Sequence, residues 1–284
     1  MDYETLKNWR FEEVVQRYTA RDSILYALGL GLGHEPMDRH QLRFVYEKEL
    51  LALPTMAVVL GYPGMFVRDP RLKIDWRRVL HGEQGVILYR PLPVEGVAIG
   101  RTRITGVIDK GAERGALLFT EREVIDGATG EHLATLQSTS VLRGDGGFGG
   151  PTGAAPEPHP IPERFPDLVE DSPTLPQSAL IYRLSGDMNP LHADPEIATA
   201  AAFPRPILHG LCTFGVVGTA LLKRCCGFDP ARLKSIRARF SSPVFPGETL
   251  RTEMWHDGAV ISFRARVVGR ETVVLNNGRA EIAV

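Results

Sequence analysis

The order of apolar and polar residues predicts strands and one buried helix in the second half of the chain. Residues 210–222 carry no charge, and a helix buried nearly all round is predicted over 210–224. The sequence Asp257-Gly258 is typical of a two-residue hairpin turn. A short helix is predicted over 198–202, and alternation predicts four strands, at 236–240, 249–256, 259–268 and 272–283.

The first half shows a similar but weaker pattern. Strands are predicted at 99–108, 117–123 and 132–142, with a turn near Asp126-Gly127. The stretch 33–54 is less apolar than the central helix of the second half. Several strands around one buried helix, formed twice, indicate an α+β fold.

A glycine-rich and then proline-rich segment separates the two halves. Residues 144–150 contain five glycines, and several prolines follow up to residue 162, so regular structure is not expected there. We therefore predict an N-terminal repeat over 1–143, a linker over 144–162 and a C-terminal catalytic repeat over 163–284.

The two halves also resemble each other. The segment 26–31 resembles 182–187, and 91–96 resembles 243–247, at nearly equal offsets. This indicates an ancient duplication. The first copy has Gly31 where the second has Asp187, and no histidine follows at the matching place, so the first copy is predicted to be non-catalytic.

Composition narrows the classes of function. The net charge of −1 and pI near 6.7 argue against nucleic-acid or membrane-surface partners. Three clustered cysteines (Cys212, Cys225 and Cys226) indicate reduced, buried thiols. No signal peptide or membrane-spanning run is recognised, and a cytoplasmic location is expected.

The segment 182–192 carries the main candidate chemistry. It places Asp187, Asn189 and His192 within six residues, and Gly186 and Pro190 favour a sharp loop. A carboxylate and an imidazole held close together suit acid–base chemistry on one small molecule. The alternative interpretation is an ordinary Asx turn that caps a helix.

A second motif, residues 206–215, leads into the predicted helix. Gly210 would lie in the first helical turn, where backbone N–H groups lack intrahelical partners and can hold a negative oxygen. Alternatively, Gly210 only allows close helix–sheet packing. His209 is interpreted as a packed, hydrogen-bonded residue at the helix start rather than as a third acid or base.

These motifs resemble those of the MaoC-like dehydratases, in which two hotdog folds lie side by side. Residues 182–192 match the hydratase 2 motif of this family. Together with the other segments, the chain resembles the hydratase 2 domain of peroxisomal multifunctional enzyme type 2 over nearly its whole length. The further matching segments are 80–84, 89–93, 108–111, 146–150, 206–214 and 238–247.

The resemblance implies a double hotdog fold, with the central helix eroded in the N-terminal repeat. It also implies reversible hydration of trans-2-enoyl-CoA to (R)-3-hydroxyacyl-CoA. Asp187 and His192 would be catalytic, Asn189 would orient them, and the Gly210 N–H would bind the thioester oxygen. Positions that contact ligand in the family match His81, Gly82, Lys110 and Phe240. No metal or other cofactor is expected, because acid–base hydration requires none. Acyl-CoA is expected as the substrate.

Three other functions remain open from the sequence: a 3-hydroxyacyl-acyl-carrier-protein dehydratase, a hotdog acyl-CoA thioesterase, and a silent acyl-CoA-binding module. The eroded first half predicts medium- or long-chain, branched or sterol-derived acyl groups. Analogy with other hotdog proteins predicts a homodimer.

Overall fold

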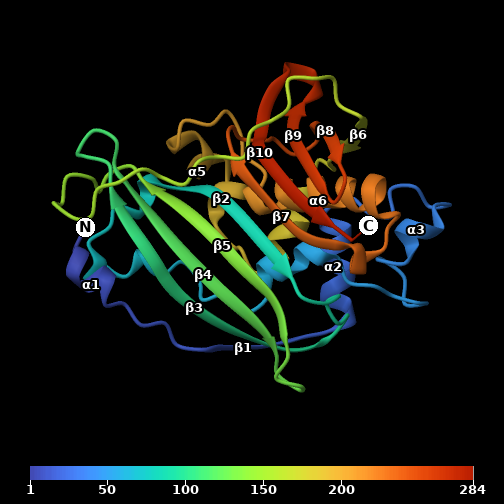
Figure 1. Ribbon diagram of the computed structural model, residues 1–284, viewed down its shortest axis with the longest axis horizontal. Coiled ribbons are helices and arrows are strands. Elements are labelled where there is room, and N and C mark those ends of the chain that lie inside the picture. The colour runs from blue at the N-terminus through green and yellow to red at the C-terminus, as the bar shows by residue number, and fades with distance from the viewer. Residues whose placement is uncertain (284) are drawn as a thin grey trace.

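A computed structural model describes residues 1–283, and its ten strands form one antiparallel sheet (Figure 1). Across the sheet the order is β1-β3-β4-β5-β2-β7-β10-β9-β8-β6. The strands are β1 (Val14–Tyr18), β2 (Val79–Leu88), β3 (Gly96–Asp109), β4 (Ala116–Asp126), β5 (His132–Leu142), β6 (Leu168–Pro173), β7 (Leu233–Phe240), β8 (Thr249–Asp257), β9 (Val260–Val267) and β10 (Thr272–Ile282).

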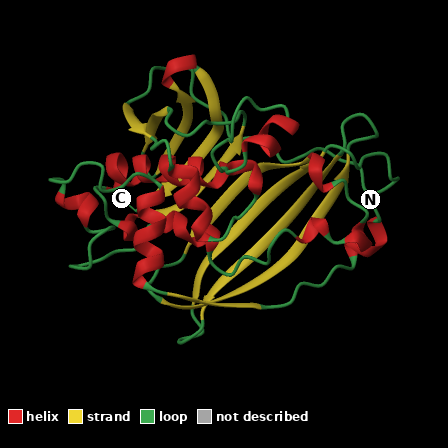
Figure 2. Ribbon diagram, turned by 180° about the vertical axis from the view of Figure 1, so that it is seen from behind, coloured by secondary structure: helices red, strands yellow, loops and turns green. Residues whose placement is uncertain are grey.

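Helices gather over one face of the sheet, mainly over the C-terminal half (Figure 2). The α-helices are α1 (Tyr3–Lys7), α2 (Ala20–Gly29), α3 (Arg39–Leu42), α4 (Ser178–Tyr182), α5 (Pro195–Ala200) and α6 (Gly210–Cys226). The 3₁₀ helices are η1 (Pro54–Val59), η2 (Phe66–Arg68), η3 (Pro70–Leu72), η4 (Trp76–Arg78), η5 (Arg183–Ser185), η6 (Pro190–His192), η7 (Pro230–Arg232) and η8 (Val268–Arg270).

The two halves repeat one strand topology. In each, the first strand lies at an outer edge, the second lies at the centre, and the other three fill the space between them. The central strands β2 and β7 pair from Glu83↔Arg239 to Ile87↔Ser235, which makes the sheet continuous. This matching order supports the duplication and agrees with the predicted double hotdog fold.

Helix α6 forms the core of the C-terminal half. Most of its residues are buried, as its unbroken apolar sequence predicts. Gly227, with φ +61°, ends it in the left-handed conformation that glycine adopts without strain. Gly218 lets the helix approach η1, because a Cβ there would lie 2.5 Å from Thr55 Cγ2.

The N-terminal half has no helix like α6 within its described residues. The corresponding segment between β1 and β2 holds α2, α3 and four short 3₁₀ helices. The 3₁₀ helix η1 packs against α6 and against the inner face of β2 and β5. Helices α2 and α4 pack together through Tyr26 and Tyr182, whose ring centroids are 5.7 Å apart. The eroded helix that the resemblance implied is therefore replaced by short, irregular segments.

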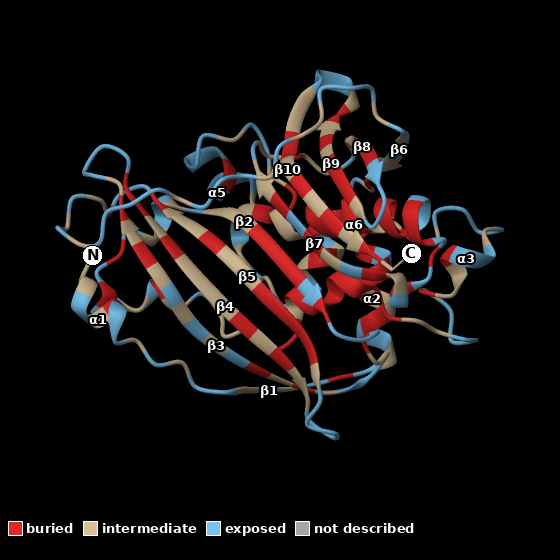
Figure 3. Ribbon diagram, in the orientation of Figure 1, coloured by how far each residue is buried: buried red, intermediate tan, exposed pale blue. Residues whose placement is uncertain are grey.

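Buried residues alternate with more exposed ones along the strands (Figure 3), as expected for a sheet with one covered face. They form two separate apolar cores. The larger core surrounds α6 and reaches Val86, Val124 and Leu136 of the N-terminal half. The smaller core, around Leu118 and Leu142, packs against α1 and η2–η4.

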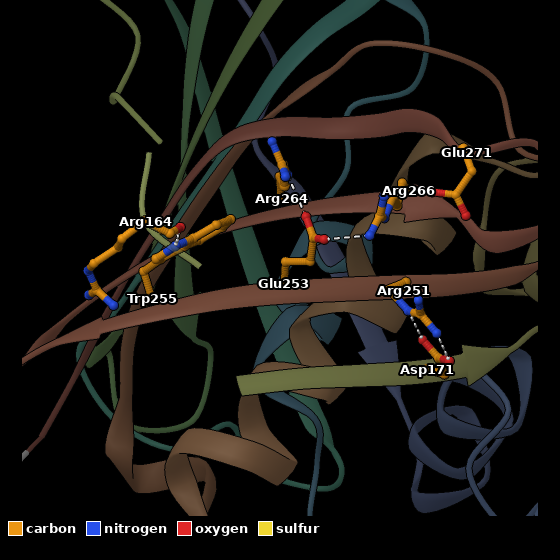
Figure 4. Close-up of polar contacts among 8 residues, drawn as sticks. All are labelled: Arg164, Asp171, Arg251, Glu253, Trp255, Arg264, Arg266 and Glu271. Atoms are coloured by element: carbon orange, nitrogen blue, oxygen red, sulfur yellow. Dashed lines mark hydrogen bonds and ion pairs between the residues drawn. The ribbon is translucent and has the colours of Figure 1, made fainter. Parts of the chain in front are cut away.

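Charged side chains cover the outer face of the C-terminal half. Glu253 on β8 accepts hydrogen bonds from Arg264 and Arg266 on β9, and Arg251 pairs with Asp171 at 2.7 and 2.8 Å (Figure 4). Trp255 Nε1 donates to the carbonyl of Arg164 at 2.7 Å and anchors the chain before β6. Cross-strand pairs of this kind suit a solvated sheet face.

Most predicted elements agree with the observed ones to within three residues. The hairpin turn is shifted by one residue, because Asp257 pairs with Val260 and the turn is therefore Gly258-Ala259. The short helix predicted at 198–202 begins earlier, at Pro195, because Asp194 caps it. Register shifts between Asn276 and Arg279 agree with the bulge predicted in the last strand. In residues 1–283, none of the helices is long and apolar enough to cross a bilayer.

Candidate active site

The loop between α4 and α5 carries the acidic residue of the site. Gly186, with φ +121°, turns the chain after η5 in a conformation that favours glycine. Asp187 Oδ1 then accepts a hydrogen bond from Asn189 N at 3.1 Å, and Asn189 Oδ1 accepts one from Leu191 N at 3.2 Å. Asn189 therefore caps η6, which delivers His192. The Asx turn of the alternative interpretation exists, and it shapes the loop.

His192 is held in one tautomer by the segment that precedes α6. Its Nδ1 lies 2.9 Å from the carbonyl oxygen of Ile207. Because a carbonyl only accepts, Nδ1 carries the proton and Nε2 keeps a free lone pair. Burial lowers the pKa of His192 below its usual range, so the ring is neutral at pH 7. A neutral imidazole with one free nitrogen can act as a base.

His209, the residue before α6, supports both catalytic candidates. Its ring stacks on His192 with centroids 3.7 Å apart, and its Nε2 donates to the Asp187 carbonyl at 3.1 Å. Tyr182 packs on the other side, 5.1 Å from His209. Burial, and then the neighbouring His192, lower the pKa of His209 to about 4, so it is neutral too. The interpretation of His209 as a packed, hydrogen-bonded helix-start residue agrees with this geometry.

Asp187, His192 and His209 come together although they lie up to 22 residues apart. Each offers one polar atom within 4.8 Å of the other two. A gap of that size between two polar groups suits one bridging water. The carboxylate and the free Nε2 of His192 can therefore handle protons of the same small molecule.

Gly210 is the first residue of α6 and follows His209 directly. A Cβ at Gly210 would lie 3.2 Å from Phe240 Cε1 at the end of β7, which is tighter than most side chains tolerate. The geometry therefore combines both interpretations of this glycine. It allows close packing, and it leaves a first-turn N–H beside the histidine pair, where an oxyanion would be stabilised.

Two further predicted residues, His81 and Gly82 on β2, lie next to Phe240. The rings of His81 and Phe240 have centroids 4.7 Å apart, and His81 Nε2 lies 3.0 Å from Ser138 Oγ. Gly82 forms a bulge, since the pairing with β5 shifts between His81 and Glu83. Gly82 and Phe240 line a cavity of about 310 Å³, which residues 155–156 of the linker also border.

Lys110 lies apart from this cluster, at the end of β3. Its Nζ donates to the carbonyl of Gly153 in the linker at 3.5 Å. The neighbouring Asp109 accepts backbone N–H bonds from Gly111, Gly147 and Gly149, which hold the glycine-rich segment on the β3–β4 turn. The structure therefore groups His81, Gly82 and Phe240 beside Gly210, and it sets Lys110 against the linker.

Protein stability is expected to fall in mild acid because the buried imidazoles are held neutral. Burial lowers the pKa of His81 to about 4, as it does for His209. An unfolded histidine titrates near pH 6.5, so below this pH the unfolded chain binds more protons than the folded chain. The stabilisation is complete above pH 6.5 and is lost towards pH 4. At pH 5, each of these two histidines should lower the free energy of unfolding by on the order of 2 kcal/mol.

Urea unfolding at pH 7.5, 6.0 and 5.0 measures this loss. His81→Gln should flatten the profile, whereas His256→Gln at an exposed position should leave it unchanged. Equal stability of the wild type at all three pH values would contradict the neutral state assigned to these rings.

Comparison with known proteins supports the resemblance found in the sequence. Residues 158–278 match the MaoC like domain, and residues 16–144 match the MFE-2 hydratase 2 N-terminal domain. The chain is 40% identical over 285 residues to enoyl-CoA hydratase 2, peroxisomal, of Arabidopsis thaliana, covering 94% of this chain and 91% of that protein. It is 39% identical to peroxisomal multifunctional enzyme type 2 of Mus musculus, covering 93% of this chain and 36% of that larger protein.

A solved structure agrees with both matches. The crystal structure of a MaoC-like dehydratase from Phytophthora capsici superposes with a TM-score of 0.87 at 39% identity, covering 100% of this chain and 99% of that one. Both halves of the chain are thus matched in sequence and in fold. The chain therefore belongs to the MaoC-like dehydratase family, in the branch that carries the hydratase 2 N-terminal domain.

Proposed function

We propose that the protein hydrates trans-2-enoyl-CoA reversibly to (R)-3-hydroxyacyl-CoA. Membership of its family makes it a hydro-lyase of the enoyl-CoA hydratase 2 type. The observation that carries the proposal is the convergence of the Asp187 carboxylate and the His192 imidazole, which bring polar atoms within 4.8 Å of each other beside the helix start at Gly210. This is the set of groups that addition of water to a conjugated thioester requires.

The proposed mechanism uses one water held between Asp187 and His192. One group takes a proton from the water as its oxygen attacks C3, and the pair returns a proton to C2 on the same face. Negative charge that develops on the thioester oxygen is stabilised by the Gly210 N–H and by the positive end of the α6 dipole. In the reverse direction the same groups remove water from the hydroxyacyl thioester.

Incubation with trans-2-decenoyl-CoA followed by chiral analysis of the product tests this function. Loss of the enoyl absorbance together with (R)-3-hydroxydecanoyl-CoA is the expected result. An (S) product, or none, would contradict the proposal. Release of free CoA, measured with a thiol reagent, would indicate a thioesterase, and a preference for the acyl-carrier-protein thioester would indicate the dehydratase.

We further propose that medium- or long-chain and branched acyl groups are preferred, because short irregular segments replace a second α6 in the N-terminal half. Kinetics on C4, C10 and branched enoyl-CoA substrates test this, and preference for C4 would contradict it. The homodimer and the cytoplasmic location stay predictions. Mass photometry tests the first and imaging of a fusion protein tests the second.

Chelation is expected to leave the rate unchanged. Asp187, His192 and His209 form a cluster that a divalent ion could enter, which sequence spacing alone did not predict. In the proposed mechanism, however, proton transfer needs the same carboxylate oxygen and nitrogen lone pairs that an ion would take. EDTA should therefore have no effect, and added Zn²⁺ should inhibit. Loss of the rate in EDTA, with recovery on adding metal, would instead assign the cluster as a metal site.

His209 is expected to act as a positioning residue. His209→Phe keeps an aromatic ring against His192 but removes the donor to the Asp187 carbonyl. One lost hydrogen bond should lower kcat about tenfold with little change in KM. His209→Gln, which keeps a side-chain N–H, should recover part of the rate. Full activity of His209→Phe would mean that the bond has no influence on the site.

A further inference from the structure

A band of polar side chains separates the two apolar cores on the inner face of the N-terminal half. On β4 the inward positions run from Leu118 of the smaller core, through Thr120 and Arg122, to Val124 of the larger core. Neighbouring strands continue the band at matching registers, through Thr102 on β3, Ser138 and Ser140 on β5, and His81 and Gln84 on β2.

Several side chains of this band are only partly covered by the protein. Thr102, Thr120, Ser138 and Ser140 are partly exposed although they point to the inner face, between residues that are fully buried. An apolar tunnel for a plain hydrocarbon chain would be lined by residues like Leu and Val. Here the partly exposed positions of the inner face carry hydroxyl groups, and the buried positions beside them carry the amide of Gln84 and the guanidinium of Arg122.

Arg122 is a buried cation that has no anionic partner within the described part of the chain. It is 8% exposed, and in residues 1–283 its single hydrogen bond runs from Nη2 to the Val58 carbonyl at 2.7 Å. Among the described residues, its Nε has no hydrogen-bond partner, and neither does Oγ1 of Thr102, the residue directly opposite on β3. A buried charge is costly unless it is paired, and buried polar groups without partners call for an explanation.

The position of Arg122 relates it to the catalytic residues. His81 lies opposite Ser140, which lies opposite Leu118, and Arg122 is four residues further along β4, roughly 13 Å in strand length. His81 contacts Phe240, which packs on Gly210. The polar band therefore leads from the expected thioester position towards Arg122.

Tyr62 lies beside Arg122, at the end of this band away from His81. The Arg122 guanidinium lies 5.4 Å from the centroid of the Tyr62 ring, which is 46% exposed. Partial burial raises the pKa of Tyr62, and the charge of Asp187 adds to this effect. The aromatic ring and the guanidinium therefore lie against each other at this end of the band.

We propose that Arg122 is a specificity-determining residue that binds a carboxylate at the far end of the acyl chain. The favoured substrates would be 2-enoyl-CoA thioesters of dicarboxylic acids, whose chain would lie along the polar band. The carboxylate would occupy the free N–H donors of Arg122, with Thr102 Oγ1 as a further donor. This inference rests on the proposed hydratase function and adds its substrate class.

Paired substrates of equal length test the proposal. The rates kcat/KM are measured for trans-2-enoyl-CoA and for its ω-carboxy analogue at C8, C10, C12 and C14. The wild type should prefer the ω-carboxy substrate at one or more of these lengths. Arg122→Gln should lower the ratio of the two rates by about tenfold or more, and Arg122→Lys should lower it less.

One control variant and a second test variant separate an effect on binding from an effect on stability. Arg103→Gln removes an exposed arginine on the outer face of β3, where it pairs with Glu121, and should leave the ratio unchanged. Arg122→Gln also removes the bond to η1 and is expected to be less stable. Thr102→Val keeps the shape of its site and should lower the ratio two- to threefold even if Arg122→Gln does not fold.

Three outcomes would overturn the proposal. The first is a wild type that prefers the plain chain at every length. The second is an unchanged ratio in Arg122→Gln and Thr102→Val. The third is weaker inhibition of Arg122→Gln by CoA alone, because the arginine would then bind a CoA phosphate. If neither series is hydrated by the wild type, the proposed function itself fails, which is a distinct result.

Discussion

Replacing Asp187 with asparagine is expected to lower kcat for decenoyl-CoA hydration by about 10²–10⁴-fold. The amide keeps the size of the side chain, and its oxygen can still accept from Asn189 N. The backbone carbonyl that His209 contacts is also unchanged. Only the charge and the ability to take a proton are lost, so the loss of rate reports proton transfer and not misfolding. Steady-state kinetics with circular dichroism on the same sample measures both.

Asp194→Asn is the matched control, because it makes the same chemical change seven residues along the chain. Asp194 caps α5 and accepts from Glu196 N at 2.8 Å, and asparagine caps helices about as well. Its rate should stay within twofold of the wild type. If Asp187→Asn retained more than a tenth of the activity, the carboxylate would not be the proton-handling group.

Local patterns made much of the fold and part of the site predictable. The uncharged run 210–222 predicted α6 because a helix surrounded by sheet needs apolar residues on every side. Gly186 and Pro190 predicted the bend that brings Asp187 near His192, since both residues restrict the backbone locally. The family resemblance then supplied the pairing of the two halves, which no local pattern contains.

Contacts between distant segments could not be predicted in this way. His209 meets Asp187 and His192 only because α6 starts beside the loop that carries them, and the sequence around His209 gives no sign of this. The polar band around Arg122 could not be predicted from the sequence either. Arginine at an alternating position usually points to solvent, and the inward direction of Arg122 follows only from the register of β4 with its neighbours.

His192→Gln is the second substitution with a large expected effect. Glutamine fills a similar volume, but it has no basic nitrogen at the place of Nε2, so kcat should fall by about 10²–10⁴-fold. In the wild type, burial lowers the pKa of His192, and its base form therefore persists below pH 6.5. The acid limb of the kcat/KM profile should accordingly lie below pH 6.5. His256→Gln, at an exposed position on β8, should match the wild type in both respects.

Combining the two substitutions tests whether the groups act on one water. If Asp187 and His192 act on a single water molecule, removing either one disables the same step. The double variant should then be as active as the less active of the two single variants. Losses that multiply would mean independent roles for the two residues. Such a result would contradict the shared-water mechanism even if both single variants were inactive, because the 4.8 Å cluster would then not work as a unit.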